Sequence, residues 1–169
     1  MSTLTQTTTV ASLAGKYLTF VLHQESYGIP VLKVREIFRP STITSVPQMP
    51  PYVKGVINLR GRIIPVIDLC AKVGLPRAAS AASACIVVVQ VSAADQRSVQ
   101  LGLIVDSVEE VSQFAAADLE PAPEFGATLD TSLILAMAKY RGGIKTLLDL
   151  DQILGHAAAA AVRTLLVQP

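Results

Sequence analysis

The residues whose type and spacing best suit chemistry are two aspartates, Asp68 and Asp149, each followed by leucine at the end of an apolar run. Two carboxylates in matching positions are groups that general acid–base catalysis uses. In both places, however, a few residues and then a glycine follow, a pattern typical of a short helix with an aspartate N-cap. We therefore predict that Asp68 and Asp149 cap helices of one or two turns, with a paired-carboxylate role as the alternative.

The other bases and nucleophiles have no partner at local spacing. His23 lies in an alternating strand and His156 borders an alanine run, while Ser107 and Ser112 flank acidic residues without a base. The sequence contains no GxSxG, P-loop, GxGxxG, HExxH or EF-hand pattern. We expect no catalytic residue, no metal site and no cofactor, and hence a protein that is not an enzyme.

A two-faced strand occurs in the stretch VKGVINLRGRIIPVIDL, residues 53–69. Because strand side chains alternate between faces, one face of its first half is apolar and is expected to join the core. That face consists of Val53, Ile57 and Leu59. The opposite face mixes two cations, an amide and a valine, namely Lys54, Val56, Asn58 and Arg60.

The charges of this mixed face suggest a recognition surface. If the first part of the chain closes as a barrel, Glu36 and Arg60 meet as an ion pair beside a groove lined by Val31, Val34 and Val108. Apolar atoms would then provide affinity and the charges would set the register of a partner. The alternative is a solvated ion pair that contributes about 0 to 1 kcal/mol to folding and nothing to function.

Two blocks of sequence recur in the same order along the chain. YGIPVLKVREI, residues 27–37, resembles LGLIVDSVEEV, residues 101–111, at an offset of 74. GRIIPVIDLCAKVG, residues 61–74, resembles GGIKTLLDLDQILG, residues 142–155, at an offset of 81. Together the blocks predict a duplicated lobe. Short strands with turn signals between them favour small barrels over βαβ units.

Composition excludes several classes of protein. The chain has 169 residues, of which 51% are hydrophobic and 16% charged, which excludes a disordered chain. A net charge of +1 without a basic stripe predicts no nucleic-acid partner. The longest apolar runs, 84–89 and 157–162, are far below the roughly 20 residues that span a bilayer, so we expect no membrane insertion. The start, MSTLTQTTTV, lacks the features of a secretory signal, which favours the cytoplasm.

Four motifs resemble one known family. YGIPVLKVREI, PPYVKGVINLRGRIIPVIDL, LGLIVDSVEEV and PAPEF, in that order and at these spacings, are similar to the CheW family of bacterial chemotaxis coupling proteins. The resemblance runs from about residue 17 to residue 154. The GVxNLRGxIxPVxDL pattern is shared with the regulatory domain of the chemotaxis histidine kinase CheA, but no phosphotransfer or ATP-binding module fits this chain.

The resemblance implies a mainly all-β fold. It consists of two small five-stranded β-barrel (SH3-like) lobes packed as one CheW-like domain, with short helices and a C-terminal helix. We place this domain at residues 16–155, with lobe one at about 24–84, lobe two at about 85–150 and the chain ends crossing between the lobes. Residues 1–15 are expected to form a flexible tail and residues 156–169 a C-terminal helix or tail.

The resemblance also implies a function. Members of the family are non-enzymatic adaptors that join the cytoplasmic signalling tip of methyl-accepting chemoreceptors to the regulatory domain of a CheA-type histidine kinase. The implied location is the cytoplasm, in association with membrane-anchored receptor arrays. Carried over by motif position, the partner-binding residues are Glu36, Lys54, Gly55, Asn58 and Arg60. The family's groove receives a helical hairpin of the receptor, and Val31, Val34 and Val108 are expected to furnish the apolar pockets that such a helix needs.

Two other functions remain open on sequence grounds. The same adaptor fold could serve another receptor–kinase pathway, such as one for surface motility or development, and the kinase that co-purifies would distinguish the two. A small-molecule enzyme or binding protein could instead use a cleft between the lobes. Stabilisation by a specific metabolite, without a protein partner, would favour that function.

Overall fold

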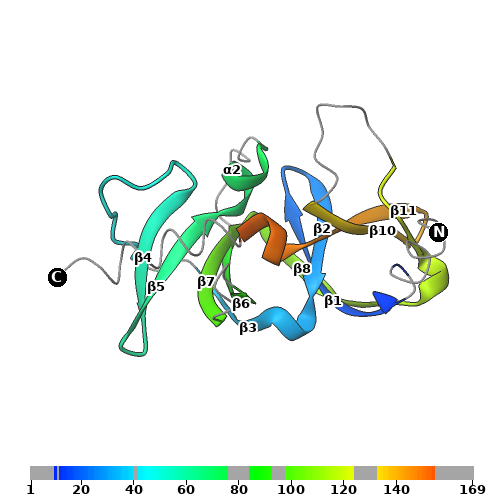
Figure 1. The fold of residues 1–169 in the computed structure, drawn as a ribbon, viewed down its shortest axis with the longest axis horizontal. Coiled ribbons are helices and arrows are strands. Elements are labelled where there is room, and N and C mark those ends of the chain that lie inside the picture. Colours follow the sequence, from blue (N-terminus) through cyan, green and yellow to red (C-terminus); the bar gives the residue numbers. More distant parts are fainter. Residues whose placement is uncertain are drawn as a thin grey trace.

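The fold consists of two β-sheets with a few short helices (Figure 1). The computed structural model describes residues 10, 12–39, 42–75, 84–92, 98–123 and 133–154. The predicted fold class, a mainly β protein with two small lobes, is confirmed. Most of the expected N-terminal tail and the expected C-terminal helix of residues 156–169 lie outside the described residues.

The six-stranded lobe, at the right of Figure 1, takes its strands from both ends of the chain. Its strand order is β8-β1-β2-β11-β10-β9. The strands are β1 (Gly15–Leu22), β2 (Glu25–Pro30), β8 (Ser107–Phe114), β9 (Leu119–Glu120), β10 (Ile134–Tyr140) and β11 (Gly143–Leu148).

The five-stranded lobe, at the left and centre of Figure 1, has the order β3-β6-β7-β5-β4. Its strands are β3 (Val34–Phe38), β4 (Val53–Leu59), β5 (Arg62–Asp68), β6 (Cys85–Ser92) and β7 (Ser98–Val105). The 3-10 helix η1 (Val31–Lys33) links β2 to β3 and so joins the two lobes, while η2 (Ala116–Asp118) links β8 to β9. In the described strands, pairing leaves each sheet open between its first and last members.

The sheets divide the chain differently from the expected lobes at about 24–84 and 85–150. β6 and β7 pair with β3 and β5, whereas β2 joins β11. Two parallel pairings cause this exchange, one between β2 and β11 and one between β5 and β7. The five-stranded lobe therefore combines the leading hairpin of the second repeat with three strands of the first, and the six-stranded lobe combines the leading hairpin of the first repeat with four strands of the second.

The duplication is visible in the register of the parallel strands. In the six-stranded lobe, Leu147 of β11 lies opposite Gly28 of β2. In the five-stranded lobe, Val66 of β5 lies opposite Gly102 of β7. These are the pairs that the offsets of 74 and 81 residues relate. Apart from β9, the two sheets have the same order of equivalent strands.

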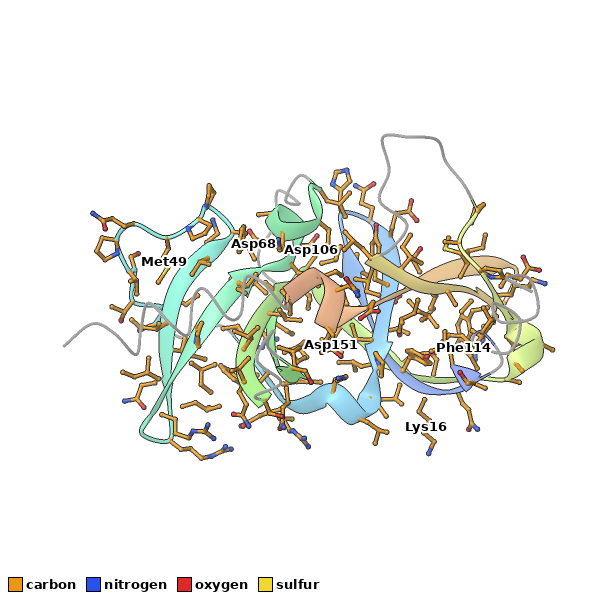
Figure 2. The ribbon with its side chains drawn as sticks, in the orientation of Figure 1. Lys16, Met49, Asp68, Asp106, Phe114 and Asp151 are labelled. Carbon is orange, nitrogen blue, oxygen red and sulfur yellow. The ribbon has the colours of Figure 1, made fainter. Side chains whose placement is uncertain are left out.

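The two lobes share one hydrophobic core. Its largest cluster combines residues of β1 and β2, such as Phe20 and Ile29, with residues of β5, β6 and β7, such as Val87 and Leu103. Smaller clusters fill the inside of each lobe. Phe114, labelled in Figure 2, lies among the strands of the six-stranded lobe. Burial of a common core between sheets makes the lobes one folding unit.

Both predicted helix caps are present. The Asp68 carboxylate accepts a hydrogen bond from the Ala71 amide at 3.4 Å, at the start of α2 (Leu69–Val73), which Gly74 ends in the left-handed conformation. The Asp149 carboxylate accepts from the Gln152 amide at 3.2 Å, where residues 150–154 are helical. These interactions confirm the capping assignment. No helix in the described part of the chain is long and apolar enough to cross a membrane.

Candidate partner-binding surface

The predicted ion pair between Glu36 and Arg60 is confirmed. Arg60 Nη1 donates to Glu36 Oε2 at 2.9 Å, and Arg60 Nη2 donates to Glu36 Oε1 at 2.7 Å. The pair is therefore bidentate, the geometry in which guanidinium and carboxylate match best. It spans the opening of the five-stranded sheet, from β3 to the end of β4, because these are the first and last strands of that sheet.

A tight turn places the guanidinium of Arg60. Arg60 and Gly61 both have positive φ, at 52° and 84°, and the Gly61 amide donates to the Asn58 side chain at 2.8 Å. The Arg60 side chain is 74% exposed and that of Glu36 is 28% exposed. At this exposure the pair contributes about 0 to 1 kcal/mol to folding, because solvent screens it. Its atoms are available to a partner.

This ion pair lines a hollow of about 310 Å³. Its other lining residues are Arg35, Leu59, Arg62, Ile64, Val88 and Gln100. Three guanidinium groups and one carboxylate thus line a hollow with an apolar floor. Sequence reasoning missed Arg35, Arg62 and Gln100, because their neighbourhood depends on the pairing of β3 with β6 and of β5 with β7.

The remaining predicted residues of β4 divide by exposure. Lys54 and Asn58 are exposed, and Ile57 is buried in the core of the five-stranded lobe, as the alternation predicted. Gly55 is buried against the backbone of Thr44. The absence of a side chain at Gly55 therefore allows the Thr44 backbone to lie close to this edge of β4.

The three predicted valines do not line the hollow around the ion pair. Val31 is half-buried in η1, while Val34 and Val108 are half-buried and pack against the shared core. Val34 of β3 and Val108 of β8 are equivalent positions in the repeat, one in each lobe. The structure thus brings together Glu36 and Arg60, but it does not gather the valines beside them.

A second hollow, of about 340 Å³, lies on the six-stranded lobe. There the Tyr140 hydroxyl donates to the Glu110 carboxylate, which also accepts from Ser112 Oγ at 3.0 Å. Lys145 is only 7% exposed; its Nζ lies 4.3 Å from the centre of the Tyr140 ring and 3.6 Å from a Glu109 carboxylate oxygen. The signal that could have revealed this site is the repeat, which matches Glu110 with Glu36.

Hydrogen bonds shift the titration of this site. Those from Tyr140 and Ser112 lower the pKa of Glu110, and the bond to Glu110 raises the pKa of Tyr140. A carboxyl with a lowered pKa adds stability that is present above its unfolded pKa and lost as pH falls through its folded pKa. Because Tyr140→Phe removes one of the two hydrogen bonds to the Glu110 carboxylate, we expect this variant to raise the pKa of Glu110, as measured by carboxyl carbon NMR. An unchanged titration midpoint would contradict the hydrogen bond.

Comparison with known proteins agrees with this fold. Residues 16–158 match the model of the CheW-like domain. The chemotaxis protein CheW of Klebsiella aerogenes is 35% identical over 159 residues, covering 91% of this chain and 93% of that protein. The chemotaxis protein CheW of Bacillus subtilis is 31% identical over 140 residues, covering 82% of this chain and 86% of that protein.

A solved structure gives the same result for the fold. The scaffolding protein TtCheW from Thermoanaerobacter tengcongensis superposes with a TM-score of 0.72 at 32% identity, covering 84% of this chain and 93% of that one. The family match extends over most of the chain and includes both sheets described above. The chain belongs to the CheW-like domain family.

Proposed function

We propose that this protein is a non-enzymatic adaptor that couples the cytoplasmic signalling tip of chemoreceptors to a CheA-type histidine kinase. Its relatives are chemotaxis proteins, and one structural neighbour is a scaffolding protein. The adaptor would act in the cytoplasm, at membrane-anchored receptor arrays. It would use partner surfaces only, with no cofactor.

The observation that carries the proposal is the exposed, bidentate pair of Arg60 and Glu36. Such a pair adds little to folding, yet it holds a guanidinium and a carboxylate in fixed positions above an apolar floor. Fixed charges around apolar contacts are typical of recognition surfaces. Beyond this pair, the proposed partner-binding residues are Val31, Val34, Lys54, Gly55, Asn58 and Val108.

Arg60→Ala tests this role. We expect the melting temperature to change little, because the pair is exposed, and receptor-dependent autophosphorylation of the kinase to fall about tenfold or more, as for an interface hot spot of about 1.4 kcal/mol. The assay combines the adaptor, a CheA-type kinase and membrane-embedded receptor from one organism.

Lys139→Ala is the matched control. Lys139 forms an exposed ion pair with Glu120 at 2.8 Å on the other lobe, so this variant also removes one exposed cation and one ion pair. We expect it to activate the kinase normally. If Arg60→Ala lowered the melting temperature strongly but left kinase activation intact, the pair would be structural and the recognition role would be lost.

A further inference from the structure

We propose that the six-stranded lobe carries a second docking surface, formed by Tyr140, Arg141 and Ile144, for an acidic segment of a partner protein. The segment would present a carboxylate beside an aliphatic side chain. This surface is separate from the Arg60 surface on the five-stranded lobe. It does not depend on the function proposed above.

The two hollows described above occupy equivalent positions in the two lobes. Arg141 follows Arg60 by 81 residues, and Glu110 follows Glu36 by 74, the offsets of the two repeated blocks. Arg60 and Arg141 even share the positive φ of their turns, 52° and 49°. The contacts of Arg60 and Glu36 in the five-stranded lobe can therefore be compared directly with those of Arg141 and Glu110 in the six-stranded lobe.

The change concerns the partner of the arginine. In the five-stranded lobe, Glu36 binds the Arg60 guanidinium through two hydrogen bonds. In the six-stranded lobe, the equivalent carboxylate of Glu110 instead accepts hydrogen bonds from Tyr140 and Ser112. Within the described ranges Arg141 forms no ion pair, and its attraction is the smallest of the effects that lower the pKa of Glu110.

The ring of Tyr140 holds this guanidinium in place. Arg141 Cζ lies 5.0 Å from the centre of the ring, within the range of a cation–π interaction, and the ring itself is anchored by Glu110. A guanidinium stacked on a ring keeps its N–H groups free for a carboxylate, and it loses little conformational entropy on binding. The site is thus preorganised for an anion.

The neighbouring side chains define the rest of the ligand. Ile144 lines the same hollow and is 61% exposed, so an aliphatic side chain of a partner could cover it. Glu109 lies 3.6 Å from Lys145 and offsets its charge, while Glu110 is bound by two hydroxyls. The Glu110 carboxylate keeps its negative charge, but the Arg141 guanidinium is the group in this hollow whose N–H donors have no acceptor among the described residues. A carboxylate of a partner would supply that acceptor, which favours an acidic segment over a basic one.

Peptide titration of the full chain, followed by amide NMR, tests the proposal. The probe is acetyl-Gly-Ser-Glu-Ile-Gly-amide, compared with the same peptide carrying Gln in place of Glu. We expect the acidic peptide to shift the signals of residues 109–111 and 140–145 saturably, and the Gln peptide to bind at least about tenfold more weakly, since a charge-assisted hydrogen bond is lost.

Four variants separate this site from its surroundings. Arg141→Gln should weaken binding of the acidic peptide about tenfold or more. Tyr140→Leu should also weaken it, because the ring beside the Arg141 guanidinium is removed. Arg60→Gln, the equivalent change in the other lobe, and Lys139→Gln, a nearby change of equal charge, should bind as the wild type does.

Several results would overturn the proposal. These are the absence of saturable shifts at millimolar peptide, equal binding of the two peptides, and unchanged binding by Arg141→Gln. Shifts of the same residues that depend on protein concentration alone would show a contact between copies of the chain instead. Because Arg60→Gln should bind the peptide normally, failure here is distinguishable from failure of the Arg60 surface in kinase activation.

Discussion

Gly55→Ala is expected to destabilise the protein by more than about 3 kcal/mol, because it combines backbone strain with a steric clash. Gly55 has φ of 145°, which L residues rarely adopt, and an added Cβ would lie 2.0 Å from the carbonyl oxygen of Thr44. That backbone cannot stay where it is. Thr44 exchanges two hydrogen bonds with Val56, at 2.9 and 2.8 Å, so moving it also breaks this bridge.

Urea unfolding of the variant measures the loss, and Gly61→Ala provides the control. Gly61 also has positive φ, at 84°, but nothing lies within 4 Å of its added Cβ. Strain alone should then cost about 1 to 2 kcal/mol. Equal losses of unfolding free energy in the two variants would mean that the Thr44 backbone moves away at little cost. The close approach of Thr44 to Gly55 would then be unimportant for stability.

Ile64→Lys is expected to cost about 3 to 5 kcal/mol, because it places an ammonium group in the apolar floor of the Arg60 hollow, beside three guanidinium groups and a carboxylate that Arg60 already binds. Ile64 is 2% exposed in the core of the five-stranded lobe. Its repeat equivalent is Lys145, which is similarly buried but lies near Thr19 and Glu109. Thr19 pairs with Gly28 in the six-stranded lobe, and Val88 pairs with the equivalent Gly102 in the five-stranded lobe, so the new lysine finds no hydroxyl there.

The reverse change, Lys145→Ile, should alter the free energy of unfolding by less than about 1.5 kcal/mol, since apolar replacement of a buried ion is often neutral. The Thr19 hydroxyl keeps a hydrogen bond to the Glu110 carbonyl at 3.0 Å. Chemical denaturation of both variants gives the comparison. A large loss for Lys145→Ile, matching that of Ile64→Lys, would show that the Lys145 network stabilises its lobe.

Local features of the sequence predicted several parts of the structure correctly. Asp68 and Asp149 cap their helices because an N-cap depends on residues within one turn. The two faces of β4 are equally local. The ion pair of Glu36 and Arg60 is not local, and its prediction came from assuming a closed first lobe and from the family motif.

The division of strands between the sheets could not be predicted in the same way. Parallel pairing of β2 with β11 joins segments more than a hundred residues apart, and each repeat contains apolar strands that could pair within it. The repeat shows which segments are equivalent, but not which copy pairs with which. For the same reason the sequence did not show that Arg141 differs from Arg60 in its partner. That difference depends on the hydrogen bond between the Tyr140 hydroxyl of β10 and the Glu110 carboxylate of β8.

The exchange of hairpins between the lobes has a consequence for how the chain can be divided. A cut between residues 75 and 84 would leave β1 to β5 on one fragment and β6 to β11 on the other. Each fragment would then hold an incomplete part of both sheets and only some of the shared core residues. Neither fragment is a domain, so native structure would require the two to associate, as the halves of a split reporter protein do.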